Sequence, residues 1–180
     1  ADKNGYAQGA FNVNAVCQVK AAVDVHQILR SPAIIQGADL ANGFMGGRTD
    51  FANSTLEDKK AGAKNIGAAV KKYAADSDIP VALHLDHGKN SDSCIAAIEG
   101  GYTSVMIDGS SLPFDENVEL TREVVKYAHE RGVTVEGELG VLAGVEDHVF
   151  AATSTYTNPL SAIDFFKKTG VDALAISYGT

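Results

Sequence analysis

The chain has 180 residues, of which 45% are hydrophobic and 21% are charged, and this composition fits one globular domain long enough to bury a core. Its formal net charge of −8 argues against nucleic acid as the main partner, because binding a phosphate backbone needs clustered Lys and Arg. A phosphorylated small molecule stays compatible with this charge, since it needs only a few local hydrogen-bond donors.

The chain carries no apolar run of 18 residues and begins with the polar stretch ADKNGYAQGA, so we expect neither a membrane span nor a signal peptide. Cys17 and Cys94 are the only cysteines and suggest no disulfide framework. A reducing compartment, the cytoplasm, is therefore the expected location.

Short aliphatic runs alternate with helical patterns along the chain. The runs predict strands, a weak one first and five stronger ones after it, at residues 6–13, 33–37, 80–85, 103–107, 133–139 and 171–177. The first helical pattern keeps Val16, Val19 and Val23 on one face and ends before Pro32.

Later helical patterns carry capping signals. Ser54 and Glu57 predict a capping box before the second long helix. Asp115 can cap the helix that follows the fourth run, and Asn158 with Pro159 forms an N-cap and first-turn pair. Each cap lies where a helix is expected to begin.

The resulting order, βαβαβαβαβαβ, predicts an α/β protein with parallel, buried strands. A doubly wound open sheet and a (β/α)8 barrel both fit, although no GxGxxG follows the first strand to support dinucleotide binding by an open sheet. In a TIM barrel this chain would supply about the first six β/α units. The long connections 38–54 and 140–158 follow strands, on the side where such folds bind ligands.

Acidic side chains lie at the ends of three consecutive predicted strands. Asp86, Asp108 and Glu138 share the strand face opposite the aliphatic residues, and His87 follows Asp86 directly. Carboxylates crowded into a barrel mouth repel one another and lose hydration, so they need a cation or a shared proton. An imidazole among them points to a divalent metal such as Zn²⁺.

Each of these residues also has a simpler interpretation when it is taken alone. A strand-end Asp usually caps the next helix, and a lone His is usually structural. It is the matched parity of the group that favours a site. Of the other histidines, His84 is expected to hydrogen-bond beneath the site, His26 and His129 to lie on helix surfaces, and His148 is left open.

Five stretches resemble the class II, metal-dependent fructose-bisphosphate aldolases and their tagatose-bisphosphate relatives: AFNVN, HLDHG, YTSVMIDGS, PFDENVELTREVVKYAHERGVTVEGELG and GVEDHV. The resemblance runs from about residue 5 to Thr180. It implies a (β/α)8 barrel that cleaves fructose 1,6-bisphosphate into glycerone phosphate and glyceraldehyde 3-phosphate. A divalent ion, usually zinc, would hold the enediolate oxygens.

The resemblance also assigns roles by position. It implies that His87 is a metal ligand, that Asp108 and Glu138 are carboxylates at the metal, and that Asp86 is the acid/base at the C4 hydroxyl. Glu146 matches an acid of a mobile loop that is implicated in proton transfer.

Two further positions are implied to touch substrate, namely Asn12 at the end of the first strand and Gly179. The resemblance also implies a homo-oligomer, a dimer or tetramer, and allows a monovalent cation as a second cofactor. No lysine stands at a strand tip to form a Schiff base, since Lys89 lies in the turn past His87, so a Lewis-acidic metal would have to stabilise the charge.

The sequence departs from the family pattern at several positions. Ala38 stands where the family usually has Ser, so a hydroxyl contact to phosphate is lost or the adjacent Asp39 changes the site. Ser111 and Leu112 stand where the family often has two histidines. The family continues past AISYGT into segments that supply two more zinc histidines, so we expect residues 1–180 to be one domain, the N-terminal portion of a barrel.

Three hypotheses follow. The first is metal-dependent cleavage of fructose 1,6-bisphosphate. The second keeps the chemistry but changes the substrate to tagatose 1,6-bisphosphate or another ketose phosphate, as the departures at Ala38, Ser111 and Leu112 allow. The third is a non-catalytic, barrel-derived binding protein, which would not need the carboxylate of Asp86.

Overall fold

A computed structural model describes residues 2–141, 144–146, 149–151 and 155–179, and within 142–154 it describes only the backbone of the two short ranges. The chain forms two compact units. The first consists of residues 1–86 and 96–104, and the second of residues 87–95 and 105–180.

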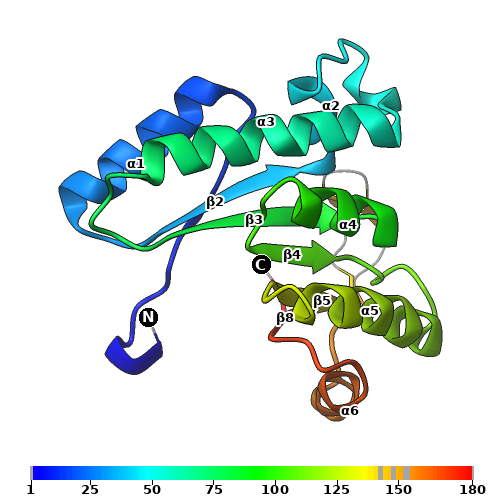
Figure 1. Cartoon of the computed structure of the whole chain (residues 1–180). Coiled ribbons are helices and arrows are strands. Elements are labelled where there is room, and N and C mark those ends of the chain that lie inside the picture. Colours follow the sequence, from blue (N-terminus) through cyan, green and yellow to red (C-terminus); the bar gives the residue numbers. More distant parts are fainter. Residues whose placement is uncertain (1, 142–143, 147–148, 152–154, 180) are drawn as a thin grey trace. The chain divides into compact units, whose positions relative to one another are not determined.

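Strands and helices alternate along the chain as the sequence predicts (Figure 1). The strands are β1 (Ala10–Asn12), β2 (Ala33–Ala38), β3 (Val81–Gly88), β4 (Ser104–Ile107), β5 (Thr134–Leu139), β6 (Gly144–Glu146), β7 (Val149–Ala151) and β8 (Ala173–Ile176). The helices are α1 (Val16–Leu29), α2 (Asp39–Met45), α3 (Leu56–Ala74), α4 (Ser91–Glu99), α5 (Phe114–His129) and α6 (Pro159–Thr169), with 3-10 turns at Asp2–Asn4 and Phe51–Asn53.

The six predicted strands are all present, and they are hydrogen-bonded in the order β1-β2-β3-β4-β5-β8. β6 and β7 form a separate antiparallel pair inside the long connection 140–158. This order follows the chain, as expected when each strand is joined to the next by a crossover helix.

In the first unit, β2 pairs in parallel with β1 on one side and with β3 on the other. Alternate side chains of β2 and β3, including Ile35, Leu83 and Leu85, are buried. They face α1 and α3, which lie side by side over the strands (Figure 1) and contribute buried Val19 and Ile66. Apolar residues recur every second position in the strands and about every 3.6 positions in the helices, so each element turns one apolar face to this core.

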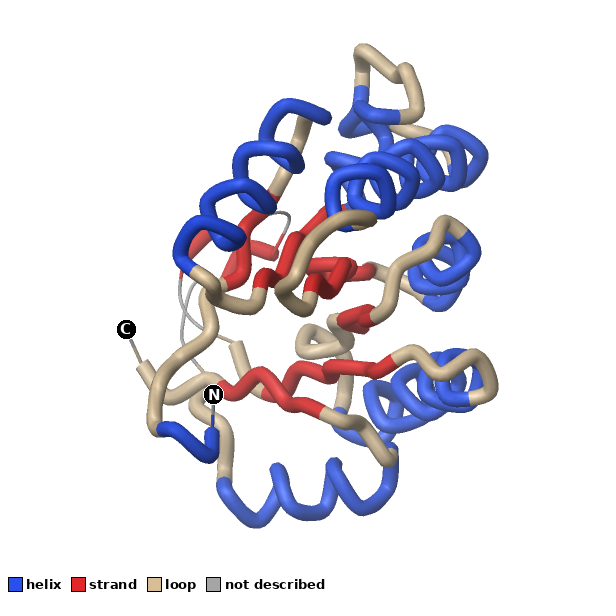
Figure 2. The backbone as a smooth tube through the Cα atoms, turned by 60° about the vertical axis from the view of Figure 1, so that its left-hand side comes forward, coloured by secondary structure: helices blue, strands red, loops and turns tan. Residues whose placement is uncertain are grey.

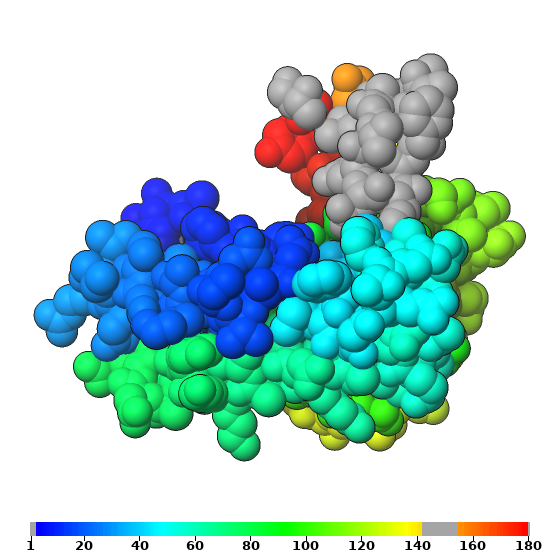
Figure 3. Space-filling view, turned by 90° about the horizontal axis from the view of Figure 1, so that it is seen from above, coloured from blue at the N-terminus to red at the C-terminus, as the bar shows by residue number. Residues whose placement is uncertain are grey.

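The connection 38–54 is not the irregular loop that the sequence suggests, because it contains α2 and the 3-10 turn at Phe51–Asn53. α2 packs on α3 backbone to backbone. A Cβ added to Gly62 of α3 would lie 1.7 Å from the carbonyl oxygen of Asn42, and one on Gly46 would lie 2.0 Å from that of Asp58. The atoms of this region form one continuous cyan surface in Figure 3.

In the second unit, β5 pairs in parallel with β8, from Glu136↔Ala173 to Leu139↔Ile176. α5 and α6 supply the apolar cover, with Val124 and Phe165 fully buried. The rings of Phe114 and Phe165 meet edge to face, with centroids 6.0 Å apart. In each unit the helices (blue in Figure 2) lie outside the strands (red).

The helix caps differ in part from the sequence prediction. The capping box of α3 is made by Thr55 and Asp58, one residue later than predicted. α5 begins at Phe114 after Pro113, with no side-chain cap, so the prediction for Asp115 is wrong. Asn158 caps α6 as predicted and accepts the N–H of Leu160 at 2.8 Å.

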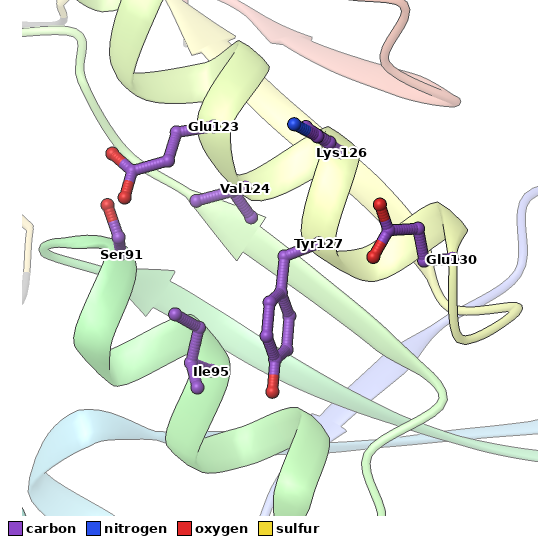
Figure 4. A pocket seen from close by; sticks show the side chains of 7 residues that line it. All are labelled: Ser91, Ile95, Glu123, Val124, Lys126, Tyr127 and Glu130. Atoms are coloured by element: carbon purple, nitrogen blue, oxygen red, sulfur yellow. The ribbon is translucent and has the colours of Figure 1, made fainter.

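A cavity of about 220 Å³ lies between α4 and α5 in the second unit. Its lining consists of Ser91, Ile95, Glu123, Val124, Lys126, Tyr127 and Glu130. Ser91 and Glu123 point toward one another across it (Figure 4). None of the predicted site residues lines this cavity, so it gives no support to the site that the sequence predicts.

Among the described residues, no helix is long and apolar enough to cross a membrane.

The contact between α2 and α3 predicts an unusual effect for Gly62→Ala. Replacing Gly by Ala inside a helix is ordinarily stabilising. Here the new methyl group would collide with the backbone of Asn42, so we expect the free energy of unfolding to fall by about 1–3 kcal/mol. Urea unfolding of the variant measures this. Ala68→Ser, at an exposed position of the same helix, is the control and should change stability by less than about 0.5 kcal/mol.

Asp172, just before β8, ties β8 to α5 and β5. Its Oδ2 accepts the N–H of Val135 at 2.8 Å and lies 2.9 Å from Nε2 of His129, the last residue of α5. Partial burial works to raise the pKa of the Asp172 carboxyl, but the hydrogen bonds from Val135 and His129 outweigh it and hold the pKa below its ordinary value of 3.8. His129 lies exposed on the surface of α5, as the sequence predicts, and its ring also pairs with Asp172.

A lowered pKa in the folded state means that the Asp172 carboxylate stabilises the fold above pH 3.8 and that this stabilisation disappears as the pH falls through the folded-state value. We expect Asp172→Asn to lower the melting temperature at pH 7, and the difference from the wild type to shrink as the pH drops below 3.8. Asp164→Asn, which breaks an exposed pair with Lys168, is the control and should do little at either pH. A pH-independent difference for Asp172→Asn would contradict the linkage.

Candidate active site

His87 has an unusual backbone conformation for its position near the end of β3. Its φ is +48°, in the left-handed region that non-glycine residues seldom occupy. The regular alternation of side chains therefore breaks at this residue. The strained backbone aims the imidazole at the carboxylates of the next two strands.

His87, Asp108 and Glu138 form a compact cluster in the second unit. Nδ1 of His87 lies 3.0 Å from Oδ2 of Asp108 and 3.5 Å from Oε2 of Glu138. One ligand atom from each residue lies within 4.8 Å of the other two. Of the four residues that the sequence predicts to converge, three lie together, and each of these comes from the C-terminal end of its own strand; Asp86 is not in this cluster.

The Asp108 carboxylate is fixed by its own turn. Its Oδ1 accepts the Ser110 hydroxyl at 2.6 Å and the Ser110 N–H at 3.0 Å. Burial acts to raise the pKa of Asp108, but the hydrogen bonds from His87 and Ser110 prevail and hold the pKa below its usual range. Asp108 is therefore charged, and its two oxygens have separate tasks, one in the turn and one at His87.

Asn117 of α5 holds the end of β5 in place. Its amide donates to the main-chain carbonyl of Glu138 at 2.8 Å, and its own oxygen accepts from Thr121 at 3.2 Å. A Cβ on Gly109 would lie 2.3 Å from that oxygen, so only glycine fits beside it. Sequence reasoning missed Asn117 and Ser110, although the turn sequence DGS after Asp108 was a signal for Ser110.

Asp86 lies in the first unit, where its partner is Asn12. The Asn12 amide donates to Oδ2 of Asp86 at 2.8 Å. The sequence suggested that Asn12 contacts substrate, whereas in the structure its amide is bonded to the carboxylate proposed as acid/base. Asp86 and His87 are consecutive in the chain.

The remaining predicted residues are placed as follows. His84 lies lower on β3, and its Nδ1 is 2.8 Å from the Ser104 hydroxyl, so the expected hydrogen bond is confirmed. His26 is not a surface residue, because it is buried against the Phe11 ring with Nδ1 2.7 Å from the Ala22 carbonyl oxygen. Gly179 has φ +113°, which a residue with a side chain rarely adopts.

Two of the predicted residues lie outside what is described. His148 is not among the described residues, and of Glu146 only the backbone, in β6, is described.

The cluster fits a divalent transition metal. It offers one imidazole and two carboxylates, the nitrogen and oxygen ligands that Zn²⁺ takes in catalytic sites. Oε2 of Glu138 is buried and faces the imidazole, so a charge there needs a cation close by. A metal ion bound at the cluster would supply that positive charge.

The whole chain, residues 1–180, matches the protein family described as fructose-bisphosphate aldolase class-II. The chain belongs to this family. Curated relatives include the fructose-bisphosphate aldolase of Treponema pallidum, 50% identical over 99% of the chain, and that of Geobacillus stearothermophilus, 40% identical over 97%. The chain spans about half the length of these relatives, 51% and 56% respectively.

Solved aldolase structures share the fold. The YdjI aldolase from Escherichia coli K12 superposes with a TM-score of 0.75 at 29% identity, over 99% of this chain and 57% of that one. The fructose-bisphosphate aldolase of Campylobacter jejuni gives a TM-score of 0.78 at 24% identity, over 98% and 55%. The fold is therefore that of a partial α/β barrel, shared with these aldolase structures. The class II family to which the chain belongs is metal-dependent.

The cluster predicts that a divalent metal stabilises the protein. A ligand that binds only the folded state stabilises it by about 2.7 kcal/mol at 100 times its dissociation constant. We expect Zn²⁺ to raise the melting temperature of the metal-stripped protein, and His87→Ala, Asp108→Asn and Glu138→Gln each to lose at least half of that increase. Differential scanning calorimetry with and without Zn²⁺ measures it.

Glu119→Gln is the matched control for this measurement. Glu119 is an exposed carboxylate on α5 that pairs with Arg122, and its loss should leave the zinc effect intact. If His87→Ala kept the full increase in melting temperature, the cluster would not be the metal site.

Proposed function

We propose that this chain carries the acid/base and the first metal ligands of an aldolase that cleaves fructose 1,6-bisphosphate into glycerone phosphate and glyceraldehyde 3-phosphate. The observation that carries the proposal is the convergence of His87, Asp108 and Glu138 in a chain of the class II family. The relatives at 50% and 40% identity bear the name of this activity, which supports fructose bisphosphate as the substrate.

In this proposal His87, Asp108 and Glu138 hold Zn²⁺ or another divalent ion. When bound, the ion would act as a Lewis acid toward the negative charge that develops on the ketose fragment. The protein's part is to hold one ligand atom of each residue within 4.8 Å of the other two and to keep Asp108 ionised through the hydrogen bonds of Ser110. Further ligands would come from the part of the relatives' length that this chain does not span.

Asp86 is proposed to handle the proton on the C4 hydroxyl. In cleavage its carboxylate takes that proton as the C3–C4 bond breaks, the C4 oxygen becomes the aldehyde oxygen, and the electron pair stays with the glycerone phosphate fragment. In condensation the same carboxyl group returns the proton to the C4 oxygen. An Asp directly adjacent in the chain to a ligand His suits this role, because the base must act close to the charge that the metal stabilises.

Other roles follow from the family match. Glu146 is proposed as the acid that moves the proton at C3 of the glycerone phosphate fragment. Gly179, whose φ of +113° excludes most side chains, is proposed to offer its backbone to a substrate phosphate. A monovalent cation is a compatible second ion.

Tagatose 1,6-bisphosphate or another ketose phosphate is the alternative substrate. Ala38, at the end of β2, has a methyl group where the family usually has a hydroxyl group. A hydroxyl contact to a substrate phosphate would then be lost, which keeps a different ketose phosphate in consideration. Cleavage rates for fructose 1,6-bisphosphate and its C4 epimer, tagatose 1,6-bisphosphate, decide between the two substrates.

We also propose that the protein acts in the cytoplasm, as a dimer or tetramer, and that residues 1–180 are the N-terminal portion of a single barrel domain.

The proposed acid/base predicts a large effect for Asp86→Asn. An amide cannot accept the hydroxyl proton, so we expect kcat for fructose 1,6-bisphosphate cleavage to fall by about 10²–10⁴-fold. The zinc-dependent increase in melting temperature should persist, because the three proposed ligands are intact. Steady-state kinetics on the full-length, metal-loaded protein provide the measurement.

Asp92→Asn, at an exposed position in the first turn of α4, is the matched control and should retain wild-type kcat. Unchanged turnover in Asp86→Asn would favour the hypothesis of a non-catalytic binding protein. Full activity after exhaustive chelation would remove the metal from the mechanism.

A further inference from the structure

The hydrogen bond between Asn12 and Asp86 spans a strand. β2 lies between β1, which carries Asn12, and β3, which carries Asp86. Neighbouring strands lie about 4.8 Å apart, so the two backbones are separated by about 10 Å. The Asn12 amide nevertheless reaches Oδ2 of Asp86 at 2.8 Å, so both side chains extend over β2 toward one another.

The register shows what lies beneath this bridge. Asn12 is level with Gln36 of β2, and Asp86 is level with Ala38. Partners in neighbouring parallel strands point to the same face, so Ala38 lies on the bridge's face while Ile35 and Gly37 are buried on the other. Gln36 shares this face and is level with Asn12, whereas Ala38, level with Asp86, presents only a methyl group at the Asp86 end of the bridge.

The end of β2 is held firmly beside the bridge. Asp39, the residue after Ala38, is paired with Lys59 of α3 at 2.7 Å, and the two side chains are only 5% and 19% exposed. One turn later, Asn42 accepts the hydroxyl of buried Tyr102 at 2.8 Å. The Asp39 carboxylate pairs with Lys59 and so anchors the strand that supports the bridge.

We propose that Asn12 is a positioning residue for Asp86, and that a small side chain at position 38 is what permits it. The inference rests on the proposed function of Asp86 as acid/base. A donated N–H fixes the plane and rotamer of the carboxylate, and a displacement of about 1 Å at a reacting group can cost about 10²-fold in rate. Asn12 thus acts on turnover through Asp86 and not through affinity for the substrate.

The first test is the kinetics of Asn12→Ala in the full-length, metal-loaded protein. We expect kcat to fall by about 10–100-fold, with KM changed by less than about two-fold, because the loss is confined to the transition state. Asn14→Ala, an exposed asparagine two residues along, is the matched control and should behave as the wild type. A raised KM with unchanged kcat would overturn the proposal and leave Asn12 as a substrate contact.

A double variant separates action through Asp86 from independent action. If Asn12 works only by orienting the carboxylate, adding Asn12→Ala to Asp86→Asn should lower the residual rate no further. If the two losses multiply, the proposal is wrong.

Position 38 supplies a readout that does not depend on turnover. In crystal structures, Ala38→Leu should place its side chain in the path and separate Asn12 from Asp86, whereas Ala38→Ser should keep the 2.8 Å hydrogen bond. An intact bridge in Ala38→Leu would overturn the role given to Ala38. A wild-type protein without aldolase activity would refute the proposed function. The rotamer of Asp86 in a crystal structure of Asn12→Ala would still test the positioning proposal. An unchanged rotamer would refute that proposal, and a displaced rotamer would support it.

Discussion

The interaction on which the site depends is the contact of one imidazole with two carboxylates. His87 reaches Asp108 at 3.0 Å and Glu138 at 3.5 Å because its backbone takes a φ of +48° at the end of β3. That conformation costs on the order of 1–3 kcal/mol for a residue with a side chain. It persists because hydrogen bonds around the cluster hold every member in position.

Those supporting hydrogen bonds come from residues outside the cluster. Ser110 fixes the far oxygen of Asp108, and Asn117 of α5 fixes the main chain at Glu138. Each joins a strand end to the loop or helix that follows, which is the usual way in which α/β folds make a ligand site rigid. Orienting partners of this kind commonly matter nearly as much as the ligands they hold.

In the first unit, the Asp86 carboxylate is held by a side chain from another strand. Asp86 is bonded to an amide that reaches across β2, and the end of β2 is anchored by the pair of Asp39 with Lys59. A buried ion pair contributes little net stability, because the attraction is offset by desolvation of both charges. Its role here is geometric: it fixes the strand end beside the carboxylate that is proposed as the acid/base.

Much of this arrangement can be predicted from the sequence. The period of two along each strand predicted that Asp108 and Glu138 lie on one face and at one end of their strands. The alternation of aliphatic runs with capped helices predicted six parallel strands. Both patterns can be read from the sequence because they follow from the direction of side chains within a single element. Only the tertiary structure decided the rest: the left-handed turn at His87, the carbonyl held by Asn117, the helix α2 within 38–54 and the bridge from Asn12 to Asp86. These features depend on contacts between residues 12 to 74 positions apart, or on a backbone angle that no local preference favours, so the periodicity of the sequence does not reveal them.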